Sequence, residues 1–289
     1  MNIRFGPAGT PDSFAKQGYK KTVQMPEYLE KMGLNAFEYQ CGRGVRIPTP
    51  AAQELGREAA SRNIALSVHA PYFISLSSLE EEKREKSIDY ILQTARAAKD
   101  MGATRIVVHS GSCAKISRQG ALALAKGTLH RAQRAMDEGG YGEIRLCPET
   151  MGKVNQLGTL AEVLELCRLD ERMLPCIDFG HLNARTFGQV NSYEAFQQVL
   201  DQVENSLGRE RARIFHAHFS KIQYTQPGGE KCHLTFEDTI YGPDFAPLAQ
   251  LLVERDASPV MICESAGTQA EDASAMFQQV QGQPGYQEG

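Results

Sequence analysis

The stretch Cys176-Ile177-Asp178-Phe179-Gly180-His181 places a carboxylate and an imidazole directly after an apolar run that begins at Met173. The run predicts a buried strand, and Gly180 predicts a turn at the end of it. Buried polar groups are costly unless they are paired, so core packing does not explain an Asp and a His three residues apart at this position. The stretch therefore indicates a functional site at the end of a strand.

The same arrangement recurs along the chain, with metal-binding residue types at the ends of apolar runs. His69 closes Leu-Ser-Val-His, His109 closes Ile-Val-Val-His, and Glu149 follows Leu-Cys-Pro. Later, His218 closes Phe-His-Ala-His and Glu264 follows Val-Met-Ile-Cys. Together with the Asp of the first stretch, these residues mark the ends of six consecutive strands.

Apolar runs alternate with segments of helical periodicity along the whole chain. We expect strands at residues 3–6, 35–39, 64–68, 105–108, 143–147, 174–177, 212–218 and 259–263. We expect helices at about 25–32, 50–62, 79–101, 117–137, 159–167, 191–207 and 244–255, and a long loop at 220–243. This alternation, without a linker-like break, predicts an α/β fold. We expect a single parallel (β/α)₈ TIM barrel over residues 1–280, followed by a C-terminal tail at 281–289.

Composition limits the class of protein. A hydrophobic content of 42% and a charged content of 23% are ordinary for a soluble globular chain. The apolar runs are far shorter than the roughly 20 residues of a membrane helix, and residues 1–5 lead into a strand without a secretory signal. Seven cysteines without a CxxC pair predict buried thiols in a reducing compartment. We expect a cytoplasmic monomer with no membrane partner, and a net charge of −4 gives no global attraction for nucleic acid.

The barrel topology converts the strand ends into one site, because strand C-termini and the loops after them form the catalytic face of such barrels. A lone His at a strand end is more often a structural residue than a metal ligand. Several imidazoles and carboxylates close together are different, since without a cation they would leave buried charges unpaired. A divalent metal removes that cost, and the share of His favours zinc over manganese.

Some residues allow two interpretations. His216 shares a strand face with His218 but lies deeper, so we expect His218 to be the ligand and His216 to support it or to pack in the interior. Arg43 and Arg46 form either a solvated loop or a phosphate contact. Tyr72 either caps the barrel or stacks on a base or sugar.

At these residues the chain resembles the endonuclease IV family of abasic-site nucleases, within the xylose-isomerase-like barrel superfamily. The resemblance covers nearly the whole chain. It is carried by His69-Ala70-Pro71-Tyr72, Val108-His109-Ser110-Gly111, Pro148-Glu149-Thr150, Ile177-Asp178-Phe179-Gly180-His181, His218-Phe219-Ser220-Lys221 and Cys263-Glu264-Ser265.

Members of that family hold three zinc ions, and the resemblance assigns residues of this chain to each ion. The implied ligands are His69, His109 and Glu149 for the first ion; Glu149, Asp178, His218 and Glu264 for the second; and His181 with an Asp-x-His pair for the third. Glu149 would therefore bridge the first two ions.

The third set departs from the family pattern. His233 stands where the His of the Asp-x-His pair is expected, but the position two residues earlier is Lys231. Either the adjacent Glu230 supplies the carboxylate after a shift of the loop, or the Lys231 ammonium occupies the place of the third ion. The usual Asp-Thr-Cys-His is also Asp-Phe-Gly-His here.

The activity implied by the resemblance is zinc-dependent cleavage of double-stranded DNA 5′ to abasic sites, in base excision repair. Metal-bound water can have a pKa of about 7, and two ions about 3.5–4 Å apart can hold the attacking and leaving oxygens in line. We expect a hydroxide beside Glu149 to attack the phosphate, and a third ion or Lys231 to stabilise the leaving oxygen. Arg43, Arg46 and Tyr72 would engage the DNA and hold the abasic nucleotide outward.

Two other functions remain open. A sugar isomerase or epimerase of the same superfamily needs one metal, often manganese, held by a Glu, Asp, His, Glu set. Glu149, Asp178, His218 and Glu264 supply that set, and the two glutamates could serve as acid and base. The surplus histidines and the absence of Trp favour the nuclease. The remaining alternative is a non-catalytic metal-binding or nucleic-acid-binding protein.

Overall fold

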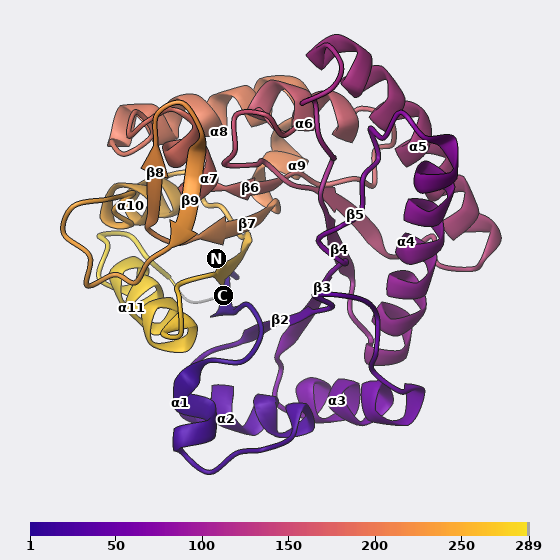
Figure 1. Cartoon of the computed structure of the whole chain (residues 1–289). Coiled ribbons are helices and arrows are strands. Elements are labelled where there is room, and N and C mark those ends of the chain that lie inside the picture. The colour runs from indigo at the N-terminus through magenta and orange to yellow at the C-terminus, as the bar shows by residue number, and fades with distance from the viewer. Residues whose placement is uncertain (288–289) are drawn as a thin grey trace.

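The computed structural model describes residues 1–287 and contains a closed barrel of parallel strands (Figure 1). The barrel strands are β1 (Arg4–Pro7), β2 (Ala36–Gln40), β3 (Ala65–His69), β4 (Arg105–Val108), β5 (Arg145–Pro148), β6 (Cys176–Asp178), β7 (His216–Phe219) and β10 (Val260–Cys263). Hydrogen bonds join them in the orders β1-β10-β7-β6 and β2-β3-β4-β5. The parallel bridges Ala8–Glu38 and Glu149–Cys176 connect the two halves. The predicted TIM barrel is confirmed.

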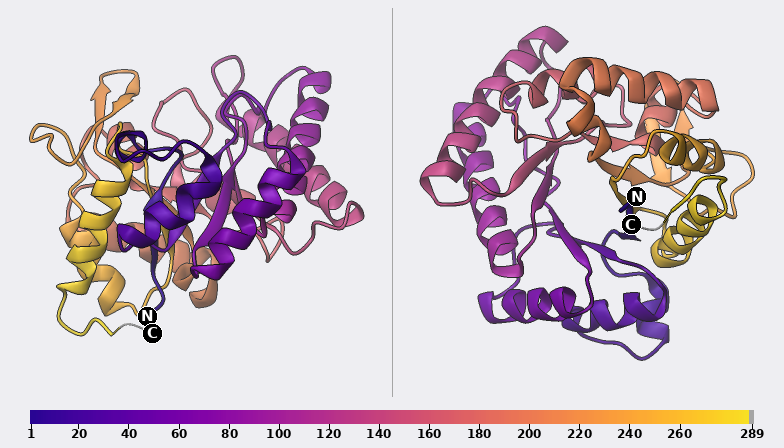
Figure 2. Two further views of the ribbon diagram at one scale, coloured as in Figure 1. Left: turned by 90° about the horizontal axis from the view of Figure 1, so that it is seen from below. Right: turned by 180° about the vertical axis from the view of Figure 1, so that it is seen from behind.

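Helices surround the barrel on its outer side in the views of Figures 1 and 2. They are α1 (Asp12–Lys16), α2 (Met25–Lys31), α3 (Thr49–Ser61), α4 (Glu81–Met101), α5 (Arg118–Glu138), α6 (Leu160–Cys167), α7 (Phe179–Arg185), α8 (Tyr193–Leu207), α9 (Arg209–Arg213), α10 (Ala246–Glu254) and α11 (Gln269–Gln281). A 3₁₀ turn at Thr22–Gln24 precedes α2.

Alternation along the strands separates an apolar layer from the barrel interior. In β2, Phe37 packs into the main hydrophobic core, whereas Ala36 packs with Ile262 in a separate small cluster. Side chains two residues apart in a strand share a face, so Glu38 lies on the Ala36 side. The barrel interior therefore receives charged side chains near the C-terminal ends of its strands, where the predicted ligands gather.

The predicted loop at 220–243 is wrong in part, because it contains a hairpin of β8 (Ile222–Thr225) and β9 (Gly229–His233). The hairpin stands at the end of the barrel opposite the two termini (Figure 2). Its antiparallel register pairs Gln223 with Cys232 and Tyr224 with Glu230, so Lys231 is an extra, bulged residue. This bulge determines which side chains of β9 face the barrel.

The predicted turn at Gly180 is also wrong, because the chain enters α7 directly after β6. The Asp178 carboxylate accepts a hydrogen bond from the His181 amide at 2.6 Å and caps this helix. Gly180 lies inside α7, where a Cβ would come within 2.4 Å of the Ser220 carbonyl oxygen. The glycine is therefore required for the close approach of α7 to the end of β7, and not for a turn.

At the C-terminus, α11 continues to Gln281 and buries Val280. The chain then returns to the other terminus, where the amino group of Met1 donates to the carbonyl oxygen of Gln287 at 3.0 Å. Of the tail expected at 281–289, Gln281 is the last residue of α11, and residues 288–289 lie outside the described residues.

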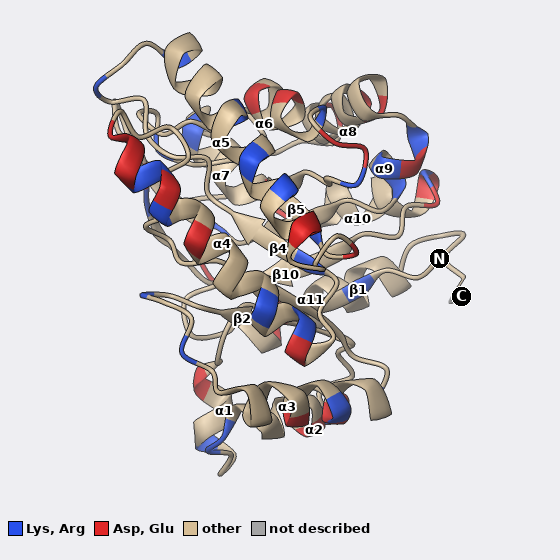
Figure 3. Ribbon diagram, turned by 90° about the vertical axis from the view of Figure 1, so that its right-hand side faces the viewer, with Lys and Arg blue, Asp and Glu red and all other residues tan. Residues whose placement is uncertain are grey.

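The outer surface carries both signs of charge close together, as along α4 in the view of Figure 3. Within residues 1–287, no helix combines the length and the apolar character that crossing a membrane requires. The seven cysteines are free thiols, and five of them are buried.

Candidate metal centre

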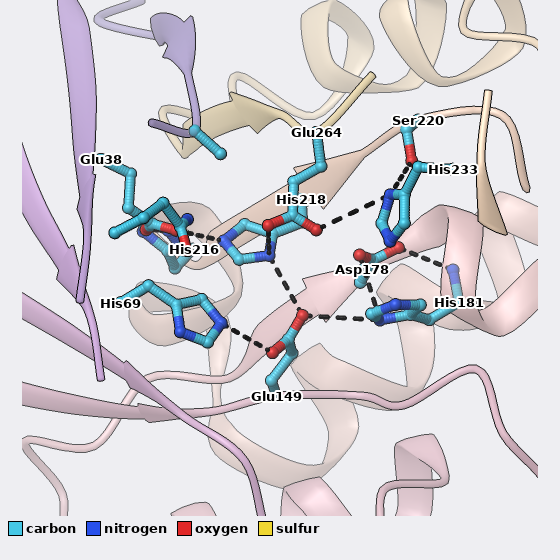
Figure 4. A network of polar contacts seen from close by, with 12 residues as sticks. Glu38, His69, Glu149, Asp178, His181, His216, His218, Ser220, His233 and Glu264 are labelled. Carbon is cyan, nitrogen blue, oxygen red and sulfur yellow. Dashed lines mark hydrogen bonds and ion pairs between the residues drawn. The ribbon is translucent and has the colours of Figure 1, made fainter. Parts of the chain in front are cut away.

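A cavity of about 320 Å³ opens where the barrel strands end. It is lined by His69, His109, Glu149, His181, His233 and Glu264 among the predicted ligands, and also by Glu230. Asp178 and His218, fully buried, contact these ligands from within the barrel (Figure 4). A larger cleft of about 500 Å³ lies away from these residues, between α8 and α10, and is lined by surface ion pairs such as Arg255–Asp201.

The first group is formed by two imidazoles that face one oxygen of Glu149. Nδ1 of His69 lies 2.7 Å from the Ala70 carbonyl oxygen, and Nδ1 of His109 lies 3.2 Å from that of Tyr72. A ring nitrogen facing a carbonyl carries the proton, which leaves Nε2 as a lone-pair donor. The two Nε2 atoms lie 3.3 and 3.1 Å from Oε2 of Glu149. All three residues thus present donor atoms to a common point.

The second group lies on the other side of the same carboxylate. Oε1 of Glu149 is 3.1 Å from Nδ1 of His218, which is 3.5 Å from Oε1 of Glu264. Burial raises the pKa of Asp178 to about 6. Oδ2 of this carboxylate is buried without an aligned hydrogen bond among the described residues, although Nδ1 of His181 lies 3.1 Å away. A divalent cation here would satisfy that oxygen, so the residues fit a metal.

The third group contains His181, Glu230 and His233, whose ligand atoms lie within 4.8 Å of one another. Oε2 of Glu230 is 3.5 Å from Nε2 of His181, and Nδ1 of His233 is 2.8 Å from the Ser220 hydroxyl. The bulge at Lys231 gives Glu230 and His233 the effective two-residue spacing that places both on one side of β9.

The structure therefore corrects the expectation for Lys231. This residue is exposed and does not line the cavity, whereas Glu230 does. Of the two alternatives open from the sequence, the arrangement is that of a carboxylate beside His181, and not of an ammonium in the place of an ion.

The carboxylates and imidazoles of this cluster shift one another's pKa values in the direction expected of a site for a cation. Burial alone would raise the pKa of Glu149, but His218 and the other imidazoles hold it well below its usual range. Burial alone would lower the pKa of His69, but the Glu149 carboxylate raises it to about 9. In the metal-free protein the Glu149 carboxylate thus favours a proton on the His69 imidazole, in the position that a divalent cation would take.

One functional candidate, Glu38, was not found from the sequence. It is fully buried in β2 and accepts hydrogen bonds from the Ser67 hydroxyl at 2.9 Å and the Gln40 amide at 3.1 Å. Its oxygens also lie 2.9 Å from Nε2 of His216 and 3.0 Å from Nε2 of His218. The sequence did contain a signal for this residue. Glu38 is an acid between Phe37 and Tyr39 in an otherwise apolar strand, and alternation along the strand directs its side chain into the barrel.

A further cluster of Cys176, His216 and His218 lies beneath the cavity. All three residues are fully buried, and burial raises the pKa of the Cys176 thiol well above its usual range. A neutral thiol is a poor metal ligand. Of the two histidines of β7, His218 directs Nδ1 to Glu149, whereas His216 directs Nε2 to Glu38.

The residues expected to contact DNA are divided. Tyr72 lines the cavity and is 53% exposed. Arg43 and Arg46 are exposed in the loop after β2 but do not line the cavity, and Arg46 lines a separate cleft beside α3. Lys153, which the sequence did not single out, lines the cavity instead, and Arg185 holds its carbonyl oxygen at 2.6 Å.

Comparison with known proteins places this architecture in a family. Residues 26–280 match the model of the xylose isomerase-like TIM barrel family. An uncharacterised protein of Methanocaldococcus jannaschii is 35% identical over 261 residues, which cover 90% of this chain and 91% of that protein. A probable endonuclease 4 of Shouchella clausii is 24% identical over 216 residues, 71% of each chain. The chain therefore belongs to the xylose isomerase-like TIM barrel family, and the resemblance to endonuclease IV is confirmed at this level.

Solved structures of similar fold carry more than one activity in their names. Endonuclease IV from Thermus thermophilus superposes with a TM-score of 0.67 at 19% identity, covering 96% of this chain and 97% of that one. A D-tagatose 3-epimerase-like protein superposes with a TM-score of 0.71 at 17% identity and the same coverage. These similarities show the fold alone, so the reaction has to be argued from the site.

Proposed function

We propose that the protein is a zinc-dependent phosphodiester hydrolase that cleaves double-stranded DNA 5′ to abasic sites. One observation carries the proposal: three groups of potential ligands surround a single cavity, and the first two share Glu149. A carboxylate whose two oxygens face different groups of ligands is suited to bridge two ions. Pairs of ions of this kind are used to hold the attacking and leaving oxygens of a phosphate.

Zinc, when bound, would lower the pKa of a water to about 7 and neutralise charge on the phosphate. The residues of the chain hold the ligand atoms in place and provide a proton acceptor. Backbone carbonyls fix the rings of His69 and His109, so their Nε2 atoms point to Glu149 without rearrangement. The carboxylate of Glu264 belongs to the second group, lies 4.0 Å from Nδ1 of His233 in the third, and is partly exposed to the cavity, where it can accept a proton from the attacking water.

The mouth of the cavity supplies contacts for the substrate. The exposed ring of Tyr72 can stack on a sugar or base beside the lesion. Lys153 offers an ammonium to a phosphate oxygen from a loop that Arg185 holds by its carbonyls. Arg43 and Arg46, which lie outside the cavity, would contact only flanking DNA.

A single-metal sugar epimerase is the second candidate, and the group of Glu149, Asp178, His218 and Glu264 favours it because that group alone can hold one ion. An epimerase would leave the groups around His109 and His233 without a purpose. Since buried imidazoles and carboxylates are costly unless they are paired or ligated, the surplus groups favour the nuclease.

The test compares both reactions on the same preparation. Metal-stripped protein is reloaded with zinc or with manganese, then given a duplex with one abasic-site analogue, an undamaged duplex, and a panel of ketoses. We expect a zinc-dependent nick on the 5′ side of the lesion, with a free 3′ hydroxyl, and no nick in the undamaged duplex. Interconversion of a ketose without nicking would overturn the proposal, as would tight binding of the damaged duplex without cleavage.

A further inference from the structure

We propose that Glu38 is a positioning residue of the metal centre, which holds the Nε2–H of His218 so that Nδ1 of the same ring faces the second group of ligands. The inference rests on the metal-binding part of the proposed function and does not depend on the substrate. It assigns a role to a buried acid whose side chain does not line the cavity.

His218 differs from three other imidazoles around the cavity in how its ring is oriented. His69, His109 and His181 each place Nδ1 at 2.7 to 3.2 Å from a backbone carbonyl oxygen. His218 is turned the other way, with Nδ1 at 3.1 Å from Glu149 and Nε2 toward the barrel interior (Figure 4). Its orientation must therefore be fixed from inside the barrel, where Oε1 of Glu38 lies 3.0 Å from Nε2.

The groups around the Glu38 carboxylate are hydrogen-bond donors, so the side chain at this position has to offer acceptor oxygens and no proton. The Ser67 hydroxyl and Nε2 of His216 approach Oε2, at 2.9 Å each. The Gln40 amide, at 3.1 Å, and Nε2 of His218 approach Oε1. The contact to His218 is at ion-pair distance without full hydrogen-bond alignment. Four groups that donate face two oxygens, which suits a carboxylate because it has about four lone-pair directions and no proton.

The neighbouring thiol cannot take this role. Cys176 approaches His218 from β6, but a thiol is a weak hydrogen-bond acceptor. The Glu38 carboxylate lies at ion-pair distance from Nε2 of His218, and its charge favours a proton on that nitrogen. Of the two, Glu38 is the group able to hold a proton on Nε2 of His218.

An amide at this position reverses the arrangement. In Glu38→Gln, one acceptor oxygen becomes an NH₂ that meets groups which themselves donate. If the NH₂ faces His218, the ring is favoured in the tautomer with an unprotonated Nε2 and a proton on Nδ1. That proton occupies the lone pair needed for the metal. We therefore expect one ion, the ion held by Glu149, Asp178, His218 and Glu264, to bind about 10- to 100-fold more weakly.

The experiment measures zinc dissociation constants of each variant by competition with a chromophoric chelator, and urea unfolding of the metal-free proteins. Glu38→Gln is compared with Glu38→Asp, which keeps two acceptor oxygens on a shorter side chain. The matched control is Asp272→Asn, the same acid-to-amide change at a buried carboxylate of α11 that accepts from Thr268 and from the Phe236 amide. We expect an intermediate loss of affinity for Glu38→Asp and none for Asp272→Asn.

The outcomes separate a positioning role from a structural one. Selective weakening of one ion in Glu38→Gln, with the remaining affinities retained, supports the inference. Equal affinities in wild type and Glu38→Gln, with only the metal-free protein less resistant to urea, would overturn it. If Glu38→Gln does not fold, Glu38→Asp decides, because unchanged zinc affinities in that variant would also contradict the proposed role. A wild type that binds no zinc would overturn the proposed function as well.

Discussion

Replacing Glu149 by Gln is the change that most directly perturbs the centre. Its Oε2 lies 3.3 and 3.1 Å from Nε2 of His69 and His109, while Oε1 lies 3.1 Å from Nδ1 of His218. An amide keeps one oxygen, so at least one of these groups would face an NH₂ that cannot bind a metal. Removing one partner from a buried charge interaction costs about 3–5 kcal/mol. At about 1.4 kcal/mol per factor of ten, zinc affinity should fall roughly 10²- to 10⁴-fold.

The assay is zinc per chain by elemental analysis after equilibrium dialysis at a fixed low concentration of free zinc. The neutral amide no longer supplies a negative charge to either of the two ions that Glu149 would bridge. We therefore expect Glu149→Gln to lose two ions. The matched variant Glu230→Gln touches the third group alone and should lose one. Far-UV circular dichroism checks that both variants fold. If Glu149→Gln retained as much zinc as Glu230→Gln, Glu149 would not be a bridge.

Three further predictions follow from single contacts. Lys231→Ala should retain the third ion that Glu230→Gln loses, because the ammonium is outside the cavity; elemental analysis would refute this if both variants behaved alike. Lys153→Ala should weaken binding of abasic duplex and reduce the salt slope by about 1, as measured in a salt titration, whereas an unchanged slope would contradict a phosphate contact. Although burial alone would raise the pKa of Glu162, Arg118 and two backbone amides hold it below its usual 4.5. This carboxylate should therefore stabilise the fold above pH 4.5, and the contribution should disappear as the pH falls through the lowered pKa. Acid unfolding of Glu162→Gln should match wild type at low pH and be less stable near neutral pH; a constant difference would refute it.

The barrel could be predicted because its strands and helices leave simple periodic signals. Runs such as Ile106–Val108 end in polar residues at the same edge, and the parallel topology brings those edges together. The residues His69, His109 and Glu149 therefore converge as the strand ends required. Local sequence and general topology were sufficient for this part of the site.

The bulge in the hairpin could not be predicted in the same way. Counting by two from His233 gives Lys231, and the sequence alone offers no measure of where β9 gains a residue. The register depends on contacts outside the hairpin, such as the hydrogen bond from the Glu230 amide to the Gly152 carbonyl oxygen. A carboxylate beside His181 is therefore the product of tertiary packing, which periodicity does not encode.

Glu38 illustrates a different limit. The strand pattern was sufficient to send its side chain inward, but its two histidine partners come from β7, 178 residues away in the case of His216. Strand order and barrel closure are needed to bring such residues into contact. The inward direction of an acid could be inferred from the sequence, whereas its role beside His218 required the structure.

The most direct test of the account is the number and position of ions in crystals grown with zinc, measured by anomalous scattering at the zinc edge. We predict three peaks: two flanking the Glu149 carboxylate, about 3.5–4 Å apart, and one among His181, Glu230 and His233. A single peak enclosed by Glu149, Asp178, His218 and Glu264, with no density beside His109 or His233, would contradict the multi-metal centre and indicate the one-metal chemistry of an epimerase.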